Sequence, residues 1–208
     1  GKQILYGPAP EGLYGTGSPP PSPWAAFPYR FETGQMETRL KNIGNAINTG
    51  TLGDMEMAYT ADLMELAGAA SVPVVSPIHP LVHFDYRIRA LRLLALFGSR
   101  ETIPFLVRVF KGDTEPLVRA AAAEAIGRVG VDPEGIAMTA FFNSLFAPGQ
   151  IRDEQVLKAV AVAAGSLCRF SGPPLSETGV RILTILGAPE RPRAVQAQAR
   201  QELRSLIH

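Results

Sequence analysis

The chain has 208 residues, of which 46% are hydrophobic and 19% are charged, and its formal net charge is +1 at pH 7. This composition allows a buried core and excludes a disordered chain, and no apolar stretch reaches the roughly 18 to 20 residues of a membrane-spanning helix. A soluble protein is therefore expected, and its single cysteine, Cys168, excludes an internal disulfide and a multi-cysteine zinc cluster.

Residues 1–34 are rich in proline and glycine, so neither a helix nor a central strand can persist there, and we expect an extended arm. Trp24 and Tyr29 lie in this arm, whereas a solvated linker normally lacks large aromatic side chains. The chain begins with Gly1, which is compatible with a processed N-terminus or a residue left by cloning. Export after removal of a signal peptide is one alternative, and the compartment is left open.

Apolar residues recur every three to four positions in residues 35–68, in two runs that predict a helical hairpin. The first run ends near Gly50, and Asp54 is expected to be the N-cap of the second helix. The apolar positions expected on that second helix are Met57, Ala58, Ala61, Met64 and Leu66. Residues 69–83 contain three prolines and are predicted to form an extended connection.

A repeated pattern begins near residue 84. Arg87 recurs as Arg119 and Gly98 recurs as Gly130, both at a spacing of 32 residues. Further helices are predicted at residues 101–111, 133–146, 156–168, 176–186 and 192–207. A single helix pair cannot bury its apolar face alone, so neighbouring pairs stack into a continuous core. We therefore predict that residues 84–208 form an all-α, right-handed α-solenoid of antiparallel helix pairs.

The run TIPFLVRVFKGDTEPLVRAAAAEAIGRVG, residues 102–130, combines a proline near a helix start, Asp113 in a turn, Arg119 six residues later and a row of alanines. It resembles a HEAT repeat of the kind also found in phycobilisome-lyase-type proteins, and the resemblance extends over about residues 84–208. The resemblance implies that Asp113 and Arg119 join adjacent repeats in a hydrogen-bonded ladder, and that the alanines let helices approach closely. The first copy has Leu81 in place of the aspartate.

One group of residues has the composition of a metal site, namely His79, His83 and Asp85. Zinc or iron needs further ligands in a defined geometry, and Pro80 breaks the helix that would align the two histidines. We favour the interpretation that these are linker histidines near a helix start.

Four carboxylates near the second predicted helix could form acid–base pairs, but an N-cap, first-turn charges and a solvated face explain them more simply. They are Asp54, Glu56, Asp62 and Glu65. The sequence contains no familiar nucleophile or phosphate-loop motif, so we assign no catalytic residue, metal or cofactor. The aromatic residues of the repeats are predicted to pack in the core, and they are Phe105, Phe110, Phe141, Phe142 and Phe146.

Basic residues recur on the predicted helices and could form a stripe on the inner face of the solenoid. This stripe would consist of Arg87, Arg89, Arg92, Arg119, Arg128 and Lys158. The alternative is a set of isolated surface charges paired with Glu115, Glu124 or Glu154. The candidate partner-binding residues are Arg89, Arg92, Glu124, Arg128 and Lys158, together with Trp24 and Tyr29 of the arm.

Stacked helix pairs present an extended surface without supplying a catalytic pocket, which favours a non-enzymatic scaffold or adaptor that binds a protein partner. Two alternatives stay open. A basic inner face would favour nucleic-acid binding. The family resemblance also implies a lyase- or glycosylase-type enzyme as a further candidate. The sequence identifies neither the partner nor the oligomeric state.

Overall fold

The computed structural model describes residues 33–68, 83–132, 134–146 and 151–207. The predicted arm and the predicted connection lie almost wholly outside these residues. All regular secondary structure in the described ranges is helical, which confirms the predicted all-α class. The α-helices are α1 (Thr33–Thr49), α2 (Glu56–Gly68), α3 (Phe84–Phe97), α4 (Ile103–Gly112), α5 (Pro116–Val129), α6 (Ile136–Ser144), α7 (Glu154–Phe170), α8 (Leu175–Leu186) and α9 (Arg193–Ser205). None of these helices combines the length and apolar character needed to cross a membrane.

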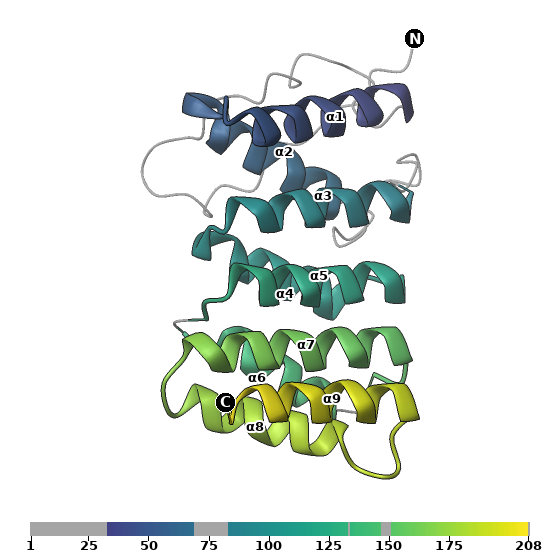
Figure 1. Cartoon of the computed structure of the whole chain (residues 1–208). Coiled ribbons are helices and arrows are strands. Elements are labelled where there is room, and N and C mark those ends of the chain that lie inside the picture. Colours follow the sequence, from purple (N-terminus) through teal and green to yellow (C-terminus); the bar gives the residue numbers. More distant parts are fainter. Residues whose placement is uncertain (1–32, 69–82, 133, 147–150, 208) are drawn as a thin grey trace.

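The helices stack in two layers, as expected for a helical-repeat solenoid (Figure 1). The first layer contains α1, α3, α5, α7 and α9, and the second contains α2, α4, α6 and α8. Successive helices of each layer pack against one another, and α4 packs on α5 as α8 packs on α7. The layered stack confirms the solenoid predicted from the repeat.

Two glycines end α3 and α5 at equivalent positions of the repeat. Gly98 and Gly130 follow these helices directly and adopt left-handed backbone conformations, with φ of 66° and 75°. Such a conformation ends a helix and is unstrained only for glycine and a few other residues. Residues that are 32 positions apart therefore occupy equivalent places on α3 and α5.

Small and aromatic side chains share the core. The alanines of α5 and α7 are buried where these helices face their neighbours. Phe110 of α4 and Phe141 of α6 pack edge to face with ring centroids 5.0 Å apart, and Phe105 is buried as well. The prediction that these three rings belong to the core is confirmed.

The start of α2 differs from its prediction. Asp54 lies within a short 3-10 turn, Gly53–Met55, and α2 begins after it at Glu56. Met57 is 54% exposed, whereas Asp62 is fully buried. The interpretation of Asp62 as part of a solvated face was wrong because Arg39 of α1 forms a buried ion pair with it, at 3.2 Å between Nη2 and Oδ1.

Candidate partner-binding surface

A buried ion pair links α3 to the turn between α4 and α5. Arg87 Nη1 lies 3.2 Å from Asp113 Oδ2, and the two residues are 3% and 4% exposed. Asp113 Oδ1 also accepts a hydrogen bond from the Glu115 amide at 2.9 Å. Burial raises the pKa of Asp113, while the Glu115 amide and the Arg87 guanidinium oppose this shift. Asp113 thus holds the turn against α3.

Arg119 lies one repeat further along and bonds to the backbone. Its Nε donates to the Phe110 carbonyl at 2.9 Å, and its guanidinium lies 5.8 Å from the Phe110 ring centroid. This bond satisfies a carbonyl at the C-terminal end of α4, which has no partner within the helix. The structure therefore places Asp113 against Arg87, the first-copy equivalent of Arg119, and places Arg119 against the end of α4.

The basic stripe must be corrected at two positions. Arg87 is buried and Arg119 is partly buried, so neither belongs to an exposed row of cations. The reason is helical register, because Arg87 shares its face with the buried Leu91 and Leu94. The long side chain turns along this face towards Asp113 and away from solvent.

The remaining candidates lie on the solvent-facing side of the first layer. We call this surface the α3–α5–α7 face. It comprises Arg89, Arg92 and Leu96 of α3, Leu117, Glu124 and Arg128 of α5, and Lys158 and Val162 of α7. Arg92 and Glu124 each precede a capping glycine by six residues, so they occupy equivalent positions on adjacent helices. The helical register therefore brings the five predicted partner-binding residues of the repeats onto one layer.

This face carries both apolar and charged side chains. Leu96, Leu117 and Val162 are 41%, 48% and 38% exposed. Within the described part of the chain, Arg92, Arg128 and Lys158 form no ion pair with Glu115, Glu124 or Glu154. The alternative in which these glutamates neutralise the basic residues is therefore not seen here.

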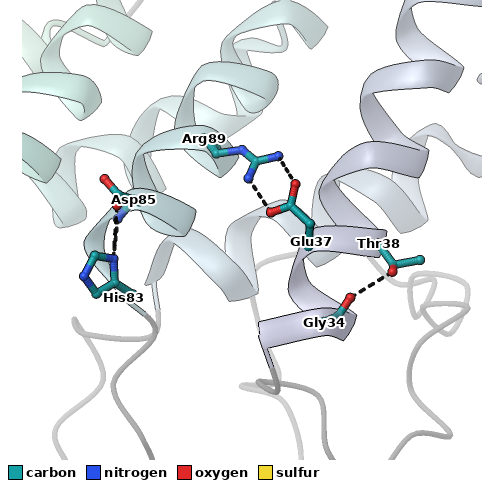
Figure 2. A network of polar contacts seen from close by, with 6 residues as sticks. All are labelled: Gly34, Glu37, Thr38, His83, Asp85 and Arg89. Atoms are coloured by element: carbon teal, nitrogen blue, oxygen red, sulfur yellow. Dashed lines mark hydrogen bonds and ion pairs between the residues drawn. The ribbon is translucent and has the colours of Figure 1, made fainter.

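Arg89 lies at the edge of the face and joins α3 to α1 (Figure 2). Its Nη1 and Nη2 lie 2.6 and 3.0 Å from the two carboxylate oxygens of Glu37. The hydrogen bond from Arg89 is the main reason that the pKa of Glu37 lies below its usual value. Arg89 is thus a neutralised residue that links two helices.

His83 and Asp85 lie nearby at the start of α3 (Figure 2). His83 is the N-cap, and its Nδ1 accepts a hydrogen bond from the Asp85 amide at 3.4 Å. His79 lies outside the described residues. Among the residues that are described, no three His, Cys, Asp or Glu side chains come together as a metal site would require.

Sequence reasoning missed a second exposed feature, between α6 and α8. Phe142 and Phe146 were expected in the core, but Phe142 is half-buried and Phe146 is 58% exposed. Their ring centroids lie 5.0 Å apart, and the Arg181 guanidinium lies 5.0 Å from the Phe142 ring centroid. Phe146 lies just beyond the end of α6, where the helical period no longer predicts which side is buried. Trp24 and Tyr29 lie outside the described residues.

Comparison with known proteins agrees with this architecture. A family model described as HEAT repeats matches residues 82–138, a segment that covers α3, α4, α5 and the start of α6. No curated protein and no solved structure matches the chain. The phycobilisome-lyase subtype stays a resemblance. Residues 82–138 of this chain are thus similar to HEAT repeats.

Proposed function

We propose that this protein is a non-enzymatic scaffold or adaptor that binds a protein partner through the α3–α5–α7 face. The observation that carries the proposal is that this face exposes two large apolar side chains, Leu96 near the end of α3 and Leu117 at the start of the adjacent helix α5. Stacked repeats use such continuous surfaces for binding. Exposed apolar side chains among polar ones have the mixed composition of a protein interface.

The charges of the face also favour a protein partner over a nucleic acid. Arg92, Arg128 and Lys158 are cations, but Glu124 lies among them and the Arg89 charge is neutralised by Glu37. A surface that follows a phosphate backbone needs a continuous row of cations, because each neutralised phosphate releases a counterion. An acidic side chain in the row lowers that affinity, whereas a mixed surface suits a partner of complementary pattern.

Affinity capture with the full chain as bait tests the proposal. The test variant is Leu96→Ser/Leu117→Ser, and the control is Val180→Ser on α8, where a side chain of similar exposure lies in the second layer. We expect the wild type and the control to retain the same protein partner and the test variant to lose it. Equal retention by all three chains would contradict the proposal. Nucleic acid retained through Arg92 and Arg128, and released by salt, would favour the alternative.

A further inference from the structure

The exposed aromatic cluster between α6 and α8 has the chemistry of a site for a proline-rich segment. We call this cluster, formed by Phe142, Asn143, Phe146 and Arg181, the aromatic groove. Its two rings meet at 48° with centroids 5.0 Å apart, so they offer two inclined apolar surfaces rather than one flat stack. Arg181 lies over one ring and Asn143 is exposed, which places polar donors beside the aromatic surface.

This combination of aromatic rings and hydrogen-bond donors favours proline-rich segments over other polypeptide segments. Proline residues lack a backbone N–H, so a proline-rich segment presents carbonyl acceptors with few donors. Arg181 and Asn143 can donate to such carbonyls, while the two phenylalanines can contact the proline rings. Aromatic-lined grooves bind polyproline II segments in this way, and the limited freedom of the free segment lowers the entropic cost of binding.

The chain itself carries a segment of this kind. Residues 18–24 read SPPPSPW, and they lie in the part of the chain that precedes α1. We propose that residues 18–24 of the same chain bind in the aromatic groove. The aromatic groove lies on the second layer of the stack, so this contact is independent of the partner surface on α3, α5 and α7.

The length of the chain before α1 allows this contact. The first-layer helices begin at the end of the stack where α4 and α6 end, so the start of α1 and the end of α6 lie at the same end of the stack (Figure 1). Packed helices lie about 8–10 Å apart. The path from α1 to α6 passes through α2 and α4, so its three helix-to-helix spacings amount to roughly 24–30 Å. Trp24 precedes Thr33 by 9 residues, which can span about 30 Å when extended, and Pro20 precedes it by 13 residues, which can span about 43 Å. The covalent tether also raises the effective concentration of the segment at the groove.

Trp24 makes the proposal directly measurable because it is the only tryptophan of the chain. Its fluorescence in the full-length protein therefore reports on residues 18–24 alone. We expect blue-shifted emission and weak acrylamide quenching in the native protein, compared with a synthetic peptide of residues 16–26. Both values should be independent of protein concentration, as befits a contact within one chain.

Phe146→Ala is expected to move the emission and the quenching of Trp24 towards those of the free peptide. Phe170→Ala is the matched control, because it removes the same side chain at a position that is 72% exposed and belongs to α7. Arg181→Gln is a second test variant that keeps the rings and removes the charged donor. Thermal melts by circular dichroism check that each variant folds.

Three results would overturn the proposal. The first is a native emission equal to that of the free peptide, which shows that the segment does not bind. The second is an unchanged Trp24 signal in folded Phe146→Ala and Arg181→Gln, or an equal change in Phe170→Ala, which places the contact elsewhere. The third is protection that grows with protein concentration, which identifies the bound segment as that of a second copy.

Discussion

Gly127 of α5 and Ala163 of α7 approach so closely that the glycine has no room for a side chain. A Cβ atom added at Gly127 would lie 2.7 Å from the Ala163 Cα atom, which is a backbone atom and cannot move aside. The α5–α7 contact therefore depends on a missing methyl group. The distance between these two helices in turn sets the spacing of the side chains on the α3–α5–α7 face.

Gly127→Ala is accordingly expected to destabilise the protein by about 1–3 kcal/mol, the usual cost of overpacking a close contact. Gly44→Ala is the matched control, because a Cβ at this position of α1 would meet Leu93 Cδ2 at an ordinary 3.9 Å. It should stabilise the protein by about 0.5–1 kcal/mol, since alanine favours a helix more than glycine does. Urea unfolding of both variants provides the measurement. A Gly127→Ala variant as stable as the wild type would show that the helices can separate freely.

Asp113→Ala should be more damaging, because it leaves the buried Arg87 guanidinium without its carboxylate. Removal of one partner from a buried ion pair typically costs about 3–5 kcal/mol. The double variant Arg87→Met/Asp113→Leu removes both charges and should recover much of that loss. Denaturant midpoints of the wild type, Arg87→Met, Asp113→Leu and the double variant form a complete cycle. Independent, additive effects would mean that the two residues do not interact.

The sequence predicted those features of the repeat that depend on local chemistry. Gly98 and Gly130 could be recognised as helix ends because a glycine after an apolar helical run has a conformational reason to be there. The partner of Asp113 could not be identified in this way, because Arg87 is distant in sequence and its direction depends on how α3 is rotated. The burial of Asp62 escaped prediction for the same reason, since it depends on Arg39 of another helix.

The contact between Glu37 and Arg89 predicts a pH dependence. The pKa of Glu37 is lowered in the folded state, so its contribution to stability is present above its unfolded pKa of about 4.3 and disappears as the pH falls through the lower folded value. Glu37→Gln should therefore lower Tm at pH 7 and have no effect at pH values well below 4. Because both side chains are exposed, added salt should also reduce the difference. A difference in Tm that persists in strong acid would point to a packing effect instead.

Cys168 is expected to react slowly with thiol reagents in the native protein. The residue is 8% exposed, its Sγ lies 3.5 Å from the Ser176 carbonyl oxygen, and burial raises the pKa of the thiol. The reactive thiolate is thus both scarce and shielded at neutral pH. The rate of reaction with Ellman's reagent should rise sharply at the urea concentration that unfolds the chain. Fast labelling under native conditions would show that α7 and α8 separate without global unfolding.

The last helix, α9, is expected to close the open end of the stack. Val195 and Ala199 are fully buried against the preceding repeat, and Glu202 lies over Gly165 of α7, where it forms a 3.0 Å ion pair with Arg169. A terminal helix with one apolar and one polar side protects the core of a solenoid from solvent and from other copies. Removal of residues 190–208 should therefore expose an apolar surface and cause self-association in analytical ultracentrifugation. Gly165→Leu tests the same contact at full length, because the new side chain would occupy the space of Glu202 and displace α9. A monomeric, folded protein after both changes would show that α7 and α8 close the stack without α9.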